Sequence, residues 1–262
     1  MATLLPGCRR SPAPAAPVSL APKPVVSAAP VVPAKPVSPL ANLTPEADQF
    51  LGSQPDAKMV AMTFDAGADD EAVPLLVKTL TERHLKCTFF LTGAFCKRFP
   101  EKCKMIADAG MELGNHSFHH PKFTTKSAEQ IHEELTTAEA EIEKACRRGA
   151  KPLFRYPYGD SDKRVRAIVA KEGYQGISWS VDSLDSVGQP KDAEFVIQRI
   201  EKKLKPGGIT LMHVSRIESA KSLPTIIDWL DAQGVKVVPV SELLEAYLHE
   251  KELKRSMTKS KK

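Results

Sequence analysis

The chain has 262 residues, a length that suits one domain of about 200 to 250 residues with appendages, or two small domains. Hydrophobic residues make up 42% and charged residues 26%, which excludes disorder over the whole chain, and no apolar run approaches the roughly 18 residues of a transmembrane helix. The net charge of +5 is carried by the two ends, while residues 41–248 sum to −3, so no nucleic-acid partner is expected.

The N-terminal region divides into a short leader and a proline-rich segment. Leu5-Pro6-Gly7-Cys8 resembles a bacterial lipobox, whose cysteine is acylated after signal cleavage, but only seven residues precede Cys8. Residues 1–10 are therefore either a lipobox remnant with a lipid anchor at Cys8 or a chance match. Nine prolines within residues 11–40 predict an extended, semi-rigid linker, which we place at residues 11–45.

Four cysteines follow the linker, and their even number is compatible with export. Cys96 and Cys103 flank a short polar stretch and could close a small loop in an oxidising compartment. The alternative is that all four, Cys87 and Cys146 included, are buried or idle thiols. Their spacing matches no zinc pattern of the C-x-x-C type, so we do not interpret them as a metal site.

From Lys58 onward, short apolar runs alternate with amphipathic stretches. We expect strands at 59–64, 87–91, 153–156, 176–179, 208–213 and 235–238. We expect helices at 71–84, 101–109, 163–171, 193–204, 219–233 and 241–249. Ser127 and Gln130 form a predicted capping box, which opens a further helix ending near Cys146. This alternation predicts a parallel sheet, either a barrel or an open doubly wound sheet.

Polar segments follow the predicted strand ends, where parallel α/β folds place their chemistry. The sequence contains no G-x-G-x-x-G or G-x-x-x-x-G-K motif, so nucleotide-binding functions lose their main support. In the first segment, Asp65 ends a buried strand, and a buried carboxylate is costly unless it is paired or used. Asp65 is thus a stronger functional candidate than Asp69, Asp70 or Glu71, which an acidic helix start also explains.

The second segment, Gly114 to Pro121, contains three of the seven histidines of the chain. His116 and His120 are four residues apart, so one helical turn would put both imidazoles on one side of a metal ion. The alternative is a polar loop that happens to contain histidines.

Two further segments complete the set of candidates. Arg155, in Phe154-Arg155-Tyr156-Pro157-Tyr158-Gly159, could hold a neighbouring carboxylate through both arms of its guanidinium. His213 ends a predicted strand, and Asp182 and Asp185 lie in the segment before it. A strand-end histidine with an acid nearby is suited to acid–base catalysis.

Taken in order, T-F-D-x-G, H-S-x-x-H-P, F-R-x-P-Y-G, W-x-V-D-x-x-D and L-M-H resemble the polysaccharide deacetylases of carbohydrate esterase family 4, the NodB-homology domain. The resemblance covers about Lys58 to His249, and we place the domain at residues 56–249, with a basic tail at 250–262. It implies an α/β fold, a distorted barrel of seven or eight parallel strands, and one divalent metal ion, usually zinc. Family members remove N-acetyl groups from chitin-like or peptidoglycan sugars, and some remove O-acetyl groups from xylan.

The resemblance also implies roles for residues on the metal side of the site. His116 and His120 would be metal ligands. Asp65 would be the catalytic base, held in place by Arg155. The backbone N–H of Tyr158 would complete an oxyanion hole together with the metal.

Roles on the acid side follow from the last two motifs. His213 would be the general acid, and Asp185 would orient or tune it. Leu211 would line the pocket for the acetyl methyl group, while Trp179 would either pack or form part of the groove wall.

Two positions depart from the family pattern. Ala66 stands where the family usually has an aspartate that is the third metal ligand, although relatives with Ala or Asn there exist. The missing ligand could be Asp65 itself, Asp69 or Asp70 from the following loop, or water beside the two histidines, and we favour a loop carboxylate slightly. Ser186 replaces a frequent tryptophan, which predicts a more open or more polar groove wall.

These features together predict a zinc-dependent N-deacetylase that acts on peptidoglycan, on N-acetylglucosamine or N-acetylmuramic acid units. The preference for peptidoglycan, and export to the bacterial periplasm or cell envelope, rest on the linker, the lipobox and the cysteines. We expect a monomer. The alternatives are a non-catalytic glycan-binding relative and a deacetylase of chitin oligomers or acetylxylan.

Overall fold

The computed structural model describes residues 40, 49–52 and 58–259, which fall within one unit of the chain. The predicted lipobox with Cys8 and, apart from residue 40, the predicted linker lie outside the described residues. The fold and the site below are those of the described ranges.

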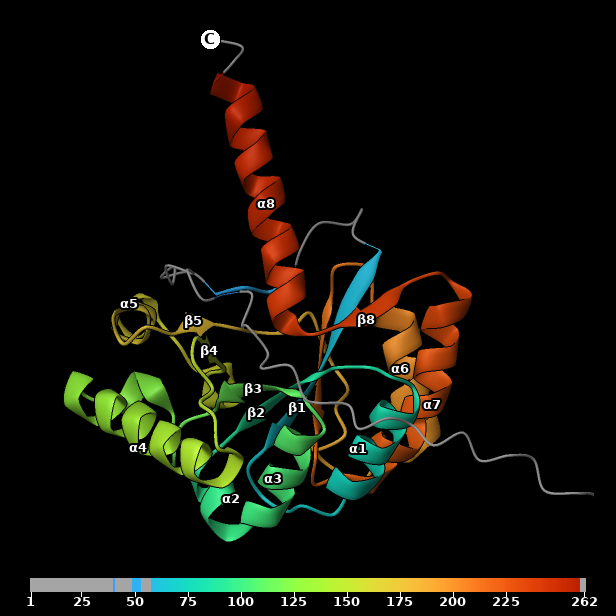
Figure 1. The fold of residues 1–262 in the computed structure, drawn as a ribbon, viewed down its shortest axis with the longest axis horizontal. Coiled ribbons are helices and arrows are strands. Elements are labelled where there is room, and N and C mark those ends of the chain that lie inside the picture. Colours follow the sequence, from blue (N-terminus) through green and yellow to red (C-terminus); the bar gives the residue numbers. More distant parts are fainter. Residues whose placement is uncertain (1–39, 41–48, 53–57, 260–262) are drawn as a thin grey trace, which may run out of the picture. The chain divides into compact units, whose positions relative to one another are not determined.

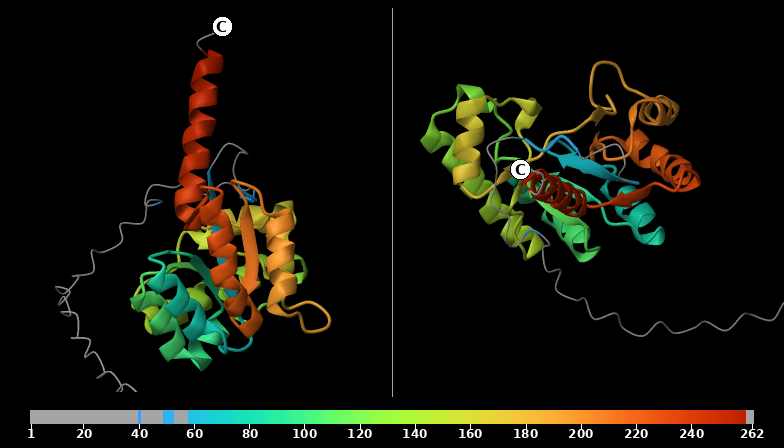
Figure 2. Two further views of the ribbon diagram at one scale, coloured as in Figure 1. Left: turned by 90° about the vertical axis from the view of Figure 1, so that its right-hand side faces the viewer. Right: turned by 90° about the horizontal axis from the view of Figure 1, so that it is seen from above.

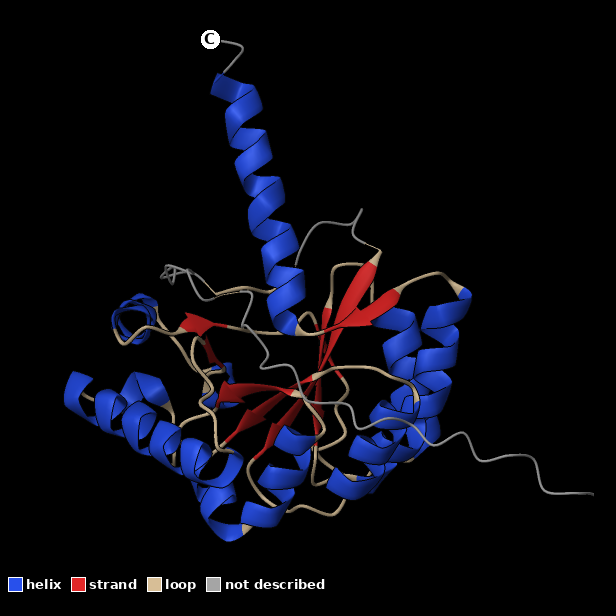
Figure 3. Cartoon of the chain, in the orientation of Figure 1, coloured by secondary structure: helices blue, strands red, loops and turns tan. Residues whose placement is uncertain are grey.

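A parallel sheet forms the centre of this unit (Figures 1 and 3). Its strands in the described residues are β1 (Met59–Ala66), β2 (Thr88–Leu91), β3 (Glu112–Asn115), β4 (Leu153–Phe154), β5 (Gln175–Gly176), β6 (Val181–Asp182), β7 (Ile209–His213) and β8 (Lys236–Val238). The order across the sheet is β5-β4-β3-β2-β1-β7-β6, and β8 pairs with the start of β1. All strand pairings are parallel, as predicted.

The sheet is a distorted, incompletely closed barrel. Strands β5 and β6 end the pairing order and are not joined to each other in it. The segment at residues 49–52 lies across this opening, because Phe50 bridges to Ile177 just after β5 and Gly52 bridges to Gly208 just before β7. The structure thus confirms the predicted barrel and excludes the open doubly wound sheet.

Helices flank the strands in all three views (Figures 1 and 2). They are α1 (Val73–Glu82), α2 (Gly93–Arg98), α3 (Pro100–Asp108), α4 (Ala128–Cys146), α5 (Lys163–Lys171), α6 (Ala193–Lys203), α7 (Ile217–Ala232) and α8 (Val240–Lys259), with 3₁₀ turns at Phe123–Thr125 and Pro157–Gly159. Among the described residues, no helix has the length and apolar character needed to cross a membrane.

Most predicted elements are confirmed to within a few residues. The capping box is present, since the Ser127 hydroxyl accepts from the Gln130 N–H and the Gln130 side chain accepts from the Ser127 N–H. Strand β3 was not predicted because glycine and asparagine are depleted in strands. Gly114 is needed there, since a Cβ atom would lie 2.3 Å from the ring of Phe90.

Other boundaries differ from the prediction. The strand predicted at 176–179 ends at Gly176, and β6, which starts at Val181, and the short helix α2 were not predicted. Helix α8 continues beyond the predicted end at His249 into residues assigned to a basic tail (Figure 1). The apolar residues of its first turns pack into the core, and this burial stabilises the start of the helix.

Two apolar clusters pack against the strands that carry the site. One apolar cluster lies between the sheet and helices α1, α3, α6 and α7. A second includes Ala61, Phe90 and Ile209 of the barrel strands, together with Val240 and Leu243 of α8. Because the strands are parallel and packed on both faces, their carboxyl ends form one rigid edge, and the site is built there.

Candidate active site

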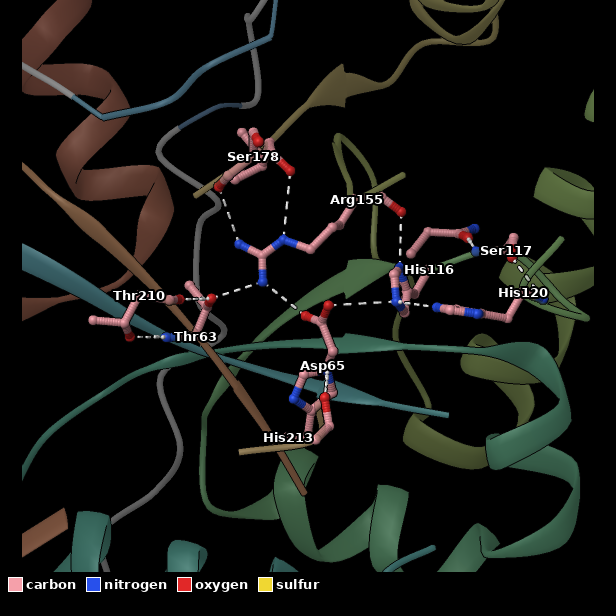
Figure 4. Close-up of polar contacts among 12 residues, drawn as sticks. Thr63, Asp65, His116, Ser117, His120, Arg155, Ser178, Thr210 and His213 are labelled. Carbon is pink, nitrogen blue, oxygen red and sulfur yellow. Dashed lines mark hydrogen bonds and ion pairs between the residues drawn. The ribbon is translucent and has the colours of Figure 1, made fainter. Parts of the chain in front are cut away.

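Four polar side chains meet at the carboxyl ends of neighbouring strands (Figure 4). Asp65 lies near the end of β1, and His116 and Arg155 follow β3 and β4 directly. His213 ends β7 and is the register partner of Asp65. Parallel pairing therefore brings together residues that are up to 148 positions apart in the sequence.

Arg155 holds Asp65 from one side. Its Nη1 lies 2.7 Å from Asp65 Oδ1 and 2.7 Å from Thr63 Oγ1, and its Nη2 donates to the carbonyl oxygen of Ser178 at 3.2 Å. The guanidinium is fully buried, and its Cζ lies 4.0 Å from the ring centroid of Phe90. The predicted pairing is present, but only one arm reaches the carboxylate because the other arm is used by the Ser178 carbonyl.

The charges around Asp65 keep it ionised. Burial raises its pKa, but the charge of Arg155, the charges that His116 and His213 carry when protonated, and the hydrogen bond from Arg155 outweigh this, and the net pKa lies below the usual value. Asp65 is therefore a carboxylate at neutral pH. Its Oδ1 is occupied by Arg155, which leaves Oδ2 directed toward His116 at 3.4 Å from Nε2.

The two histidines face each other across a short gap. Nδ1 of His116 lies 2.8 Å from the carbonyl oxygen of Arg155, which can only accept, so Nδ1 carries the proton and Nε2 keeps a free lone pair. Nε2 of His120 lies 3.1 Å from this atom. Burial lowers the pKa of both imidazoles, to about 4 for His120, so both are neutral at pH 7, the form that binds metals.

A loop, and not the predicted helical turn, brings these histidines together. His116 follows β3, and both Ser117 (φ 65°) and His120 (φ 60°) adopt left-handed backbone conformations. The prediction that the two imidazoles converge is thus met by a different geometry. The ring of Tyr158 packs edge-on against His120, with centroids 4.4 Å apart.

The donor atoms suit a divalent metal ion, but they are fewer than the three firm protein ligands of a usual catalytic zinc site. Two neutral imidazole nitrogens and the outer oxygen of Asp65 are donors that zinc accepts. In the ranges that the structure describes, no three His, Cys, Asp or Glu side chains form a group able to hold a metal ion. The residues therefore fit a site with two firm protein ligands, His116 and His120, with Asp65 beside it.

The loop carboxylates lie elsewhere. Asp69 is 3.7 Å from Arg98, and Asp70 is 3.6 Å from Lys102, so both face helices α2 and α3. The structure does not bring either aspartate to the histidines, and the slight preference for a loop carboxylate as third ligand has no support in this geometry. Ala66 is buried and offers only a methyl group.

His213 and Asp185 form a tight pair on the other side of Asp65. Nδ1 of the His213 ring lies 2.7 Å from Asp185 Oδ1. The other oxygen, Asp185 Oδ2, accepts from the backbone N–H of His213 at 2.9 Å and from the Ser219 hydroxyl. Burial lowers the pKa of His213, but the bond to Asp185 and its charge outweigh this, and the net pKa is raised. Nε2 faces Ser186 Oγ at 3.4 Å.

The remaining predicted residues line the same region. Among the hydrogen bonds of the described chain, none uses the N–H of Tyr158, whose φ is 60°, so this donor is available to a ligand. Leu211 is buried in β7 opposite Thr63. Trp179 packs closely under Gly159, where a Cβ atom would lie 3.1 Å from the indole, which supports the packing role.

Sequence reasoning missed two supporting hydroxyls. Thr63 precedes Asp65 by two residues on the same strand, so the period of two in a β-strand was a signal that it shares the face of Asp65. Ser219 lies 34 residues from Asp185 on helix α7, and no local pattern indicates its contact with that carboxylate.

Comparisons with known proteins show the family to which the chain belongs. Residues 52–177 match the family profile described as polysaccharide deacetylase. The chain is 31% identical to the peptidoglycan-N-acetylmuramic acid deacetylase PdaA of Bacillus subtilis, over 78% of each protein. It is 32% identical to a chitooligosaccharide deacetylase of Azorhizobium caulinodans, over 69% of this chain and 92% of the relative. The chain therefore belongs to the polysaccharide deacetylases of carbohydrate esterase family 4, a family of hydrolases.

Solved structures of the family match the same part of the chain. The structure of Bacillus subtilis PdaA has a TM-score of 0.73 and 31% identity, over 76% of this chain and 86% of that one. A family 4 pseudoenzyme from Bacillus anthracis has a TM-score of 0.72 and 32% identity, over 76% and 69%. A mutant of that pseudoenzyme, described as having restored enzymatic activity, also matches, with a TM-score of 0.72.

Proposed function

We propose that this chain removes N-acetyl groups from the amino sugars of peptidoglycan, with a zinc ion held by His116 and His120. The observation that carries the proposal is the placement of an ionised Asp65 between these neutral histidines and the His213–Asp185 pair. A base and an acid thus lie on neighbouring strands beside two metal-binding nitrogens. The named activity of PdaA, a peptidoglycan deacetylase, supports the choice of substrate.

The residues around Asp65 serve the attack on the acetyl carbonyl. A bound divalent ion would lower the pKa of a water molecule and polarise the carbonyl. Asp65 accepts the proton of the attacking water at Oδ2, because Arg155 occupies Oδ1. The N–H of Tyr158 donates to the developing oxyanion, and one such donor is typically worth about 2.7–4 kcal/mol.

His213 serves the departure of the amine. An amine leaves readily only when it is protonated, so the imidazole must be cationic at that step. Its raised pKa favours this form, and Asp185 fixes Nδ1–H so that Nε2 faces outward. General acid catalysis of this kind contributes about 10²–10⁴-fold to the rate.

A second candidate function is glycan binding without turnover. Ala66 removes the ligand that the family pattern supplies, and a family 4 pseudoenzyme is among the similar solved structures. The same residues would then recognise an acetylated sugar without hydrolysing it. Chitin oligomers and acetylxylan are alternative substrates within the first proposal.

Acetate release separates these functions. Purified protein is incubated with N-acetylglucosamine oligomers, acetylxylan and peptidoglycan, with a chelator and after zinc is restored. Acetate that disappears with chelator and returns with zinc supports the deacetylase, and the preferred polymer identifies the substrate. If no acetylated glycan releases chelator-sensitive acetate while the protein still binds one of them, the glycan-binding role replaces the enzymatic one.

A further inference from the structure

The loop that carries the two histidines is strained. Between β3 and the turn at Phe123, both Ser117 and His120 have positive φ values without being glycine. Such conformations cost of order 1–3 kcal/mol each and persist only when the surroundings hold them. Within the loop, the Ser117 hydroxyl accepts from the His120 backbone N–H at 3.1 Å, and further contacts come from outside the loop.

Two groups of contacts hold this loop from opposite sides. The carbonyl oxygens of Ser117 and Phe118 accept from the N–H groups of Gly93 and Ala94 in the first turn of α2, at 3.0 and 3.1 Å. The loop N–H groups face a side chain of α4 instead. Oε2 of Glu134 accepts from the N–H of Phe118 at 2.9 Å and from the N–H of His119 at 2.8 Å.

Glu134 makes a third contact with the same loop. Its Oε1 lies 2.8 Å from Nδ1 of His119, whose side chain is 71% exposed. Glu134 itself is only 12% exposed, since it lies on helix α4 one turn from the buried residues Ile131 and Ala138. One carboxylate thus accepts two backbone N–H groups that otherwise lack a partner among the described residues, and a charged acceptor makes these bonds stronger than neutral ones.

We propose that Glu134 is a positioning residue for the metal ligand His120. It fixes the backbone of Phe118 and His119, and this in turn fixes the left-handed turn at His120 that places its Nε2 3.1 Å from His116 Nε2. The inference rests on the proposed metal site. It assigns a role in metal binding to Glu134, a residue of helix α4 that lies outside all five sequence motifs.

The contacts of Glu134 with the loop matter more in this chain than in a chain that has the usual family ligands. A carboxylate at position 66, as the third metal ligand, would anchor the metal to β1 whatever the position of the loop. With Ala66, the protein's firm ligands are His116 on the strand end and His120 on the loop, so displacement of the loop removes half of them. Ala66→Asp is therefore expected to reduce the effect of losing Glu134.

The test is zinc affinity, measured by competition with a chromophoric chelator, together with the absorption spectrum of the cobalt-loaded protein. Glu134→Ala is expected to weaken zinc by about 10–100-fold, the usual range for residues that orient a metal ligand, and to alter the cobalt spectrum. Glu134→Gln keeps one oxygen to accept the two backbone N–H groups and is expected to restore most of the affinity.

Matched controls come from the same helix and loop. Glu133 lines the same cavity of about 440 Å³ as Glu134 but has no bond to the loop among those that the structure shows, so Glu133→Ala should leave zinc affinity unchanged. His119→Ala removes only the ring contact and should leave affinity within about threefold, since both backbone contacts remain. Thermal unfolding of the metal-free variants shows whether they are folded.

Zinc affinity of folded Glu134→Ala equal to that of the wild type overturns the inference, and so does an equal loss in Glu133→Ala. A loss in Glu134→Ala that Ala66→Asp fails to reduce contradicts the proposed dependence on the missing carboxylate. If the wild type binds no zinc at all, the proposed function itself fails, which the wild-type titration shows before any variant is compared.

Discussion

At the residue scale, the site separates charge states that identical side chains would share in water. His120 and His213 have the same imidazole, but burial beside His116 lowers the pKa of one to about 4, whereas the bond to Asp185 raises the pKa of the other. One is thereby suited to hold a metal and the other to hold a proton. Assignments of acid and ligand follow from such divergent environments.

The first prediction concerns the two proposed ligands. His116→Ala and His120→Ala should each abolish stoichiometric zinc retention, because the described part of the chain supplies no third firm protein ligand to compensate. Metal content after dialysis is measured by plasma emission spectrometry. His119→Ala, in the exposed position between them, is the matched control and should retain zinc. A ligand variant that keeps one equivalent of zinc would remove that residue from the site.

The second prediction concerns pH. The carboxylate of Asp185 raises the pKa of His213, so protonated His213 persists above the pH at which free imidazole loses its proton. In Asp185→Asn this charge is absent, and the alkaline limb of kcat/KM should move to lower pH. The acid limb, set by Asp65, should stay in place. Ser219→Ala, which keeps the carboxylate, should move the alkaline limb less than Asp185→Asn does. An unmoved limb in Asp185→Asn would mean that His213 is not the acid.

At the element scale, strand ends were predictable and connections were not. Apolar runs located β1, β2 and β7, and hence Asp65 and His213, because burial of both faces gives a continuous hydrophobic signal. The loop after β3 gave no such signal. Its shape depends on Glu134 and on the first turn of α2, which are distant in sequence and have no periodic pattern. The helical turn expected between His116 and His120 was wrong for this reason.

The third prediction concerns helix α8, whose two halves differ in burial. Val240, Leu243 and Leu244 are buried against the barrel, whereas Leu253 and Met257 are exposed. A chain ending at Glu250 should therefore unfold within about 0.5 kcal/mol of the full chain, the usual range for surface changes. Leu243→Ala should lower the free energy of unfolding by about 2–5 kcal/mol. Urea unfolding followed by circular dichroism measures both. A large loss in the truncated chain would show that the distal half has a structural partner.

At the scale of the whole molecule, segments outside the motifs lie across the opening of the barrel. Phe50 bridges to Ile177 just after β5 and packs against Tyr247 of α8, with tilted rings whose centroids lie 5.3 Å apart. The region before the first motif and the region after the last one thus meet in one apolar cluster with the barrel strands. The family resemblance predicted the barrel, but not these contacts, because they depend on residues that belong to no motif.

The four cysteines of the described chain are free and buried, with Sγ atoms of Cys96 and Cys103 3.4 Å apart.

The fourth prediction links the metal to the stability of the whole domain. A ligand that binds only the folded state stabilises it by about 2.7 kcal/mol at a concentration of 100 times its Kd. For a domain of this size, each kcal/mol raises Tm by about 2–4 °C. Zinc at that excess should therefore raise Tm by about 5–11 °C over chelator-treated protein, and the shift should be absent in His116→Ala. Scanning calorimetry measures this shift in Tm, with magnesium as a control that prefers oxygen ligands and should have little effect.

Because the barrel core is complete without the site, we expect the metal-free protein to remain folded. Cooperative unfolding lost on chelation would instead make the metal a structural component, and an equal shift in His116→Ala would place the zinc elsewhere on the molecule.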